Sequence, residues 1–317
     1  MLYVFFVVTG LFFCSMIKSM NTCSSDYLPL ACLGGYDTEI IHYNKDVVVK
    51  QPSKEKIKKY AMQGIHTITI DGASCQEVAQ WGRMKVEITQ IPEDSLEQLV
   101  ICAEKDIFRR IIKNKNISCL EIGLHRSDEP VCSCKDIVMR LKLKNLVKIV
   151  TNNCVDTIFL SPIRSEKLHI SVALGATMQL PFIRAKTIEL LVKENSSLIA
   201  QDDARLKAKD LLFIYREGSS KIELGVKTKL LQAQSNGKGA IILKGVATEQ
   251  ELRFLEGSLF AMGLQSKEVR MEVVAGVGEV ELCADSVKGV MSVKSNYDIT
   301  YCAPSKDSLC IYPAEEL

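Results

Sequence analysis

Residues 211–254 read LLFIYREGSSKIELGVKTKLLQAQSNGKGAIILKGVATEQELRF, and apolar and polar residues alternate on either side of the turn-forming spots GSS and NG. The same unit, a strand-like segment, a turn and a second such segment, recurs over residues 168–304. Its copies begin at Leu168, Ile188, Leu211, Leu231, Glu251, Val269 and Val290. Alternation predicts β-strands, and a fixed period of about 20 residues is typical of a stacked repeat fold.

Two all-β folds can use such a period. In a meander the two strands of one unit pair as a hairpin, whereas in a solenoid each strand lies on its equivalent one coil later. Apolar residues recur at matching offsets, so that like stacks on like, which favours the solenoid. We therefore predict a parallel β-helix or β-solenoid from Val147 to Tyr301, wound right-handed as parallel crossovers are, with a β-rich N-terminal cap.

Strand alternation also predicts which side chains form the core of this solenoid. Leu190, Phe213 and Phe254 are expected to point inward at equivalent positions, while Glu189 and Arg253 point outward. Phe213→Ala would then remove a large core side chain.

Shorter alternating segments precede the repeats, at 65–71, 86–91, 118–124 and 138–143. One segment is ambiguous, because residues 96–111 carry apolar residues at helical spacing while residues 98–102 also fit a buried strand. Taken in order, three segments resemble the opening of the GIN domain family, the head domain of auto-transporter adhesins: Ile65–Asp71, Val86–Gln90 and Val100–Asp106. The repeats and the closing strand Asp298–Tyr301 resemble the rest of that family.

The resemblance covers roughly residues 62–304 and implies a parallel β-helix-like body with a non-enzymatic surface role. It also favours a strand over 98–103, followed by at most a short helical turn over 105–112. The expected organisation is an export signal or N-terminal anchor at 1–20, an irregular leader at 21–61, a GIN-like solenoid at 62–304 and a C-terminal tail at 305–317. Within the solenoid, 62–145 form the cap and first strands and 146–304 the repeats.

The N-terminal segment indicates the compartment of the protein, and the net charge limits its class of partner. Residues 2–17 are almost wholly apolar and precede Lys18, as in a secretory signal. We expect an exported protein of the periplasm, cell envelope or cell surface, in contact with a membrane only through a retained anchor. The net charge of +2 gives no field that would recruit nucleic acid.

Twelve cysteines are present, and their pairing cannot be deduced from spacing. If the protein reaches an oxidising compartment, the most plausible local disulfide joins Cys302 to Cys310, which flank a short loop after the last repeat strand. The alternative is two unpaired thiols.

Catalytic motifs are missing from the sequence: it holds no nucleophile elbow, zinc quartet or phosphate-binding glycine loop. His169 fits a structural role in a repeat strand. Two weaker readings use the turn at Asp202-Asp203, namely a carboxylate site near Lys227 and a calcium site with Glu194. We expect no catalytic, cofactor-binding or metal-binding residues and no cofactor.

The function expected is therefore a non-enzymatic binding, adhesion or structural module of the envelope or surface. Its partner would be a protein or a glycan, and self-association is a further possibility, since exposed strand edges at a solenoid end invite pairing. The alternative is a carbohydrate-active enzyme on a β-helix scaffold.

Overall fold

The computed structural model describes residues 55–73, 83–124, 136–202, 204–302 and 309–314, all within one compact unit, residues 51–317. These residues form one continuous network of strands and the four-residue helix α3 (Lys105–Phe108). The strands are β1 (Glu55–Ala61), β2 (Thr67–Asp71), β3 (Met84–Gln90), β4 (Gln98–Glu104), β5 (Ile111–Lys115), β6 (Cys119–Leu124), β7 (Ile137–Leu143), β8 (Lys148–Asn152), β9 (Val155–Phe159), β10 (Ile163–Val172), β11 (Thr177–Leu180), β12 (Ile183–Val192), β13 (Ser197–Ala200), β14 (Arg205–Glu217), β15 (Lys221–Asn236), β16 (Ala240–Phe254), β17 (Ser258–Val273), β18 (Val277–Ser292), β19 (Asn296–Cys302) and β20 (Leu309–Ala314).

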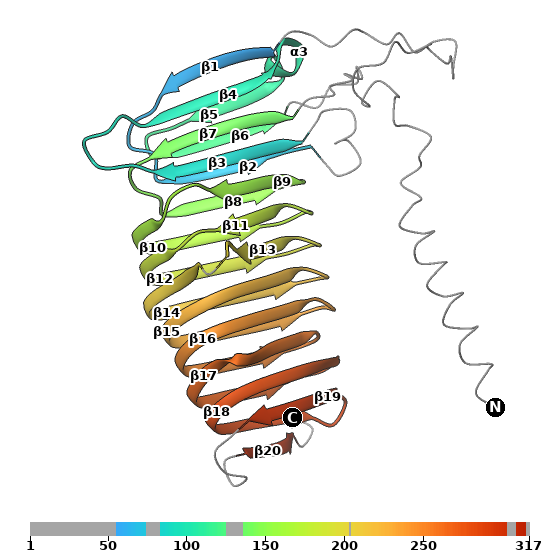
Figure 1. Cartoon of the computed structure of the whole chain (residues 1–317). Helices are drawn as coiled ribbons and strands as arrows, with labels where there is room; N and C mark the ends of the chain where they lie inside the picture. The colour runs from blue at the N-terminus through green and yellow to red at the C-terminus, as the bar shows by residue number, and fades with distance from the viewer. Residues whose placement is uncertain (1–54, 74–82, 125–135, 203, 303–308, 315–317) are drawn as a thin grey trace, which may run out of the picture. The chain divides into compact units, whose positions relative to one another are not determined.

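Equivalent strands of successive coils pair in parallel. The series β10, β12, β14, β15, β16, β17 and β18 is parallel at every step, and Figure 1 shows the coils stacked from β8 down to β18. The short strands β9, β11 and β13 stack in the same way. The prediction of a β-solenoid is therefore confirmed, and hairpin pairing within a unit is excluded. The right-handed sense stays a prediction.

From β15 onward one long bent strand carries almost a whole coil. β15 spans Lys221–Asn236, and its first part pairs with β13 while its second part pairs with β14. A tight turn at Gly237, which has a φ of 103°, then leads into β16. Because one strand and one turn complete a coil, the sequence period equals the coil length.

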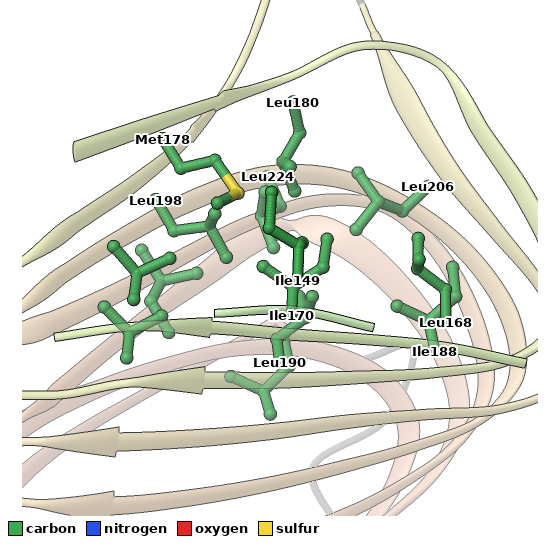
Figure 2. Packing of buried hydrophobic residues seen from close by; sticks show 14 of the residues in the cluster. Ile149, Leu168, Ile170, Met178, Leu180, Ile188, Leu190, Leu198, Leu206 and Leu224 are labelled. Carbon is green, nitrogen blue, oxygen red and sulfur yellow. The ribbon is translucent and has the colours of Figure 1, made fainter. Parts of the chain in front are cut away.

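Columns of aliphatic side chains fill the interior. Ile149, Ile170 and Leu190 occupy the same register position on β8, β10 and β12, and all three are fully buried. Figure 2 shows these three side chains together with the neighbouring pair Leu168 and Ile188. Each coil therefore buries its apolar face against the next coil rather than within itself.

The expected inward position of Phe213 is wrong. The register partner of Leu190 is Ile214, while Phe213 lies opposite Glu189 on the outward face and is only half-buried. β14 holds one more residue than its neighbours between Ala208 and Leu211, and the register shifts there. A slip of one residue moves every following side chain to the other face of a strand.

The other orientations are as expected. Leu190 and Phe254 point inward and are fully buried, whereas Glu189 and Arg253 point outward. Phe254 does not share the column of Leu190, however, because its register partner is Ser235 and not Ala233.

The N-terminal end uses antiparallel pairing: β1 with β4, β4 with β7, and β5 with β6. The predicted strand over residues 98–103 is confirmed as β4, and α3 is the short helical turn expected after it. Residues 55–61, expected as irregular leader, instead form β1. Their lysines are exposed, which suits a charged strand at a sheet edge.

The C-terminal segment also differs from expectation. Residues 309–314, placed in the tail, form β20, which pairs in parallel with the second half of β18. The sequence analysis ended the repeats at residue 304, but parallel backbone pairing continues beyond it. The proposed signal or anchor, residues 1–20, lies outside the described residues. Within the described ranges no helix has the length and apolar character needed to cross a membrane.

Candidate functional site

A groove of about 820 Å³ lies on the outward face of the second halves of β15 to β18 and of β20. Parallel register brings polar side chains that are nineteen or so residues apart in sequence to adjacent positions, about 4.8 Å from strand to strand. Two columns result. The first holds Gln232, Glu251, Arg270 and Lys288; the second holds Gln234, Arg253, Glu272 and Val290.

Charges within the groove are paired across and along the strands. Arg270 lies between two carboxylates, with Nε 3.1 Å from Glu268 Oε1 and Nη1 3.7 Å from Glu251 Oε1. Its hydrogen bond to Glu268, and then the charge of that residue, raise the pKa of Arg270 above its usual value. In the second column Arg253 Nε lies 3.2 Å from Glu272 Oε2. These pairs place guanidinium and carboxylate groups next to one another on the outward face.

Gln232 extends this network by donating from Nε2 to Glu251 Oε2 over 2.8 Å. Glu251 thus accepts from an amide on one side and faces a guanidinium on the other. The groove as a whole contains three carboxylates and three cationic groups, so its net charge is zero. It offers donors and acceptors side by side without a strong field of either sign.

The C-terminal end of the groove has a different character. Lys288 forms no ion pair with any described residue. Beside it, Val290 and Tyr312 are register partners on β18 and β20, and 44% and 64% of their surfaces are exposed. This end therefore combines an ammonium group with an exposed aromatic ring.

Comparison with known families places this architecture. Residues 76–301 match the family described as "Putative auto-transporter adhesin, head GIN domain", which is well over half of the 317 residues. The chain belongs to the GIN family. The expected resemblance is thereby confirmed, and the groove lies on the repeats of a GIN domain.

Three solved structures share the fold of this GIN domain. Each is described as a "putative adhesin", from Parabacteroides merdae (16% identity, TM-score 0.55, 83% of this chain and 97% of that chain), Parabacteroides distasonis (14%, 0.54, 83% and 98%) and Bacteroides fragilis (15%, 0.53, 84% and 100%). At such identities the likeness shows the fold alone. No curated protein gives a significant match.

The histidine considered in the sequence has a partner. His169 Nδ1 lies 2.9 Å from Glu189 Oε2, its register neighbour on β12. The pair belongs to the same outward column as Gln232 but lies nearer the N-terminal end of the GIN domain, outside the groove. This contact fits a structural role for His169.

The acidic turn is only partly visible. Asp202 adopts a left-handed backbone conformation with a φ of 40°, and Asp203 lies outside the described residues. The carboxylate site and the calcium site both include Asp203, and both stay predictions. The described residues contain no group of three or more His, Cys, Asp or Glu side chains that could hold a metal ion.

The predicted disulfide between Cys302 and Cys310 is wrong in this structure, where both are free thiols. Cys302 lies opposite Cys283 and Cys310 opposite Lys288. Positions 283 and 288 are separated by roughly 16 Å of extended strand, far more than the spacing of about 4.4–6.8 Å between the Cα atoms of a disulfide. The extra strand β20 therefore carries Cys310 away from Cys302.

A buried arginine was not anticipated from the sequence. Arg216 on β14 is fully buried, and its guanidinium donates to the carbonyl oxygens of three successive turns: Gly218 (2.6 Å), Gly237 and Glu256 (3.1 Å). It also donates to Ser235 Oγ. A Cβ at Gly239 or Gly257 would clash with this group. Desolvation lowers the pKa of Arg216. Arg216 thus acts inside the GIN domain as a structural clamp on its turns.

Proposed function

We propose that this GIN-family chain is a non-enzymatic binding module of the cell envelope or cell surface. The observation that supports this most is the family match over residues 76–301, whose description is that of an adhesin head. The groove on β15 to β18 and β20 supplies the surface, because its paired side chains present a fixed pattern of hydrogen-bonding groups. The partner would be a protein or a glycan.

Export is part of the proposal. It is supported by the apolar segment at residues 2–17 and by Cys154, which is disulfide-bonded. Disulfides persist mainly in oxidising compartments. Localisation of the full chain, with and without residues 1–20, tests this. Envelope or surface location that is lost on deletion is expected, and a cytosolic full chain would contradict it.

Binding without turnover is the second test. The purified chain is incubated with polysaccharides, and retention and the release of reducing ends are measured together. Retention with no release is expected from a binding module. Release that disappears in the Asp202→Ala, Asp203→Ala double variant would contradict the proposal and favour a carbohydrate-cleaving enzyme.

A further inference from the structure

We propose that the groove binds a glycan chain, with one carboxylated sugar held between Lys288 and Tyr312. This inference rests on the proposed binding function and names its ligand. The glycan would lie across the coils, from Gln232 on β15 towards Tyr312 on β20.

The length and shape of the groove favour an oligomer over a single sugar. Its lining residues come from five neighbouring strands, and four strand-to-strand steps span about 19 Å. Because β15, β16 and β17 each contribute polar groups at the same two positions, successive units of a polymer would meet similar partners there. A repeating surface of this kind matches a repeating ligand.

The hydrogen-bonding groups suit a hydroxyl-rich ligand. Each sugar hydroxyl both donates and accepts, and the groove places amides, carboxylates and guanidinium groups in alternation. The exposed pairs Arg270–Glu268 and Arg253–Glu272 favour these positions before a ligand arrives. Pre-ordered side chains lose less conformational entropy on binding.

Charge distinguishes between classes of ligand. With equal numbers of carboxylates and cations, the groove lacks the positive stripe that a nucleic acid requires. Lys288 is the exception at its C-terminal end, since among the described residues no carboxylate pairs with it. A sugar carboxylate would supply that partner.

Tyr312 provides the apolar part of the same subsite. The residue is 64% exposed and stands next to the exposed Val290. Tyrosine presents an apolar face with a polar tip, and the C–H face of a pyranose ring can pack on such a surface while its hydroxyls reach the ion pairs. The ammonium group of Lys288, the ring of Tyr312 and the neighbouring ion-paired side chains together define the acidic sugar subsite.

Calorimetric titration of the full chain with tetragalacturonic acid and with cellotetraose tests the inference. The acidic tetrasaccharide is expected to bind more tightly. Lys288→Gln should reduce its affinity to that of cellotetraose and leave cellotetraose unchanged. Tyr312→Ala should weaken the affinity for each tetrasaccharide by about tenfold or more, the loss typical of an anchoring aromatic side chain. Tyr312→Phe should retain binding. Lys227→Gln, an exposed lysine on the other half of β15, is the matched control and should change nothing.

Several outcomes would overturn the inference. Equal binding of both tetrasaccharides, unaffected by Lys288→Gln, would remove the carboxylate subsite. Binding that survives both Lys288→Gln and Tyr312→Ala would place the glycan elsewhere. If neither saccharide binds at millimolar concentration while the chain still attaches to intact cells, the ligand class is wrong and the binding function stands. If attachment to cells also fails, the proposed function fails with it.

Discussion

Cys283 and Cys302 occupy the same register position on the parallel strands β18 and β19. Both thiols are free, Cys302 is exposed and Cys283 is half-buried. Burial, followed by a hydrogen bond to Cys302, raises the pKa of the Cys283 thiol. Adjacent register positions on one face bring Cα atoms within the range that a disulfide needs.

Mild oxidation of the folded chain with glutathione disulfide should therefore join Cys283 to Cys302. Each thiol loses a proton, one S–S bond forms, and the two electrons reduce the reagent to two thiols. Peptide mapping without reduction should find this link. A link between Cys302 and Cys310, or free Cys283 after full oxidation of exposed thiols, would contradict the register.

The Arg216 clamp should contribute strongly to stability. Among the described residues Arg216 is the only donor to the Gly237 carbonyl oxygen, whereas the oxygens of Gly218 and Glu256 also accept from Gly239 N and Ser235 Oγ. Arg216→Ala therefore leaves one carbonyl oxygen without its donor, and we expect the free energy of unfolding in urea to fall by about 1–3 kcal/mol. The control is Arg253→Ala, a half-exposed arginine on the outward face, which should stay within about 0.5 kcal/mol of the wild type. Equal effects of the two variants would argue against the clamp.

Two phenylalanines test the core register. Phe254→Ala removes a fully buried ring and should cost about 3–5 kcal/mol, whereas Phe213→Ala changes a half-buried outward side chain and should cost much less. Urea unfolding of both variants measures the difference. The reverse order would mean that β14 has no extra residue.

Tyr297 should make the protein sensitive to alkali. Burial, the main cause, raises the pKa of Tyr297 to about 12. A raised pKa means that the folded state holds the proton more tightly, so this contribution is complete below about pH 10 and is lost as pH rises to about 12. Stability should fall by about 2–3 kcal/mol across that window.

The matched variant is Tyr297→Phe. Among the described residues the Tyr297 hydroxyl has no hydrogen-bond partner, so its removal should leave stability at pH 7 unchanged or slightly higher and should reduce the alkaline loss. Unfolding curves at pH 7 and at pH 11 measure both effects. A large loss at pH 7 would show that the hydroxyl is bonded.

Much of the fold follows from local pattern. Alternation and the recurring period predict parallel stacking, because each coil must bury its apolar face on the next. The register of β14 is not readable in the same way. Residues 211–215 are apolar on both faces, so Phe213 and Ile214 are equally good candidates for the core, and only pairing with β12 and β15 decides between them.

The groove could be predicted from the sequence in part, whereas the Arg216 clamp could not. Gln232, Glu251 and Arg270 recur at intervals of nineteen residues, a spacing that could have revealed the first column. Arg216 breaks the alternation rule, since a charged residue occupies an inward position. Its partners are backbone carbonyl oxygens of three turns, which no side-chain pattern encodes.

The central claim is that the outward face of β15 to β18 and β20 is a binding surface. Attachment of the labelled full chain to intact cells tests it most directly, with the Arg270→Ser, Tyr312→Ala double variant compared against Lys227→Gln on the other half of β15. Loss of attachment by the groove variant, at unchanged thermal stability, with full attachment of the control, is the predicted result. Undiminished attachment of the groove variant would contradict the account.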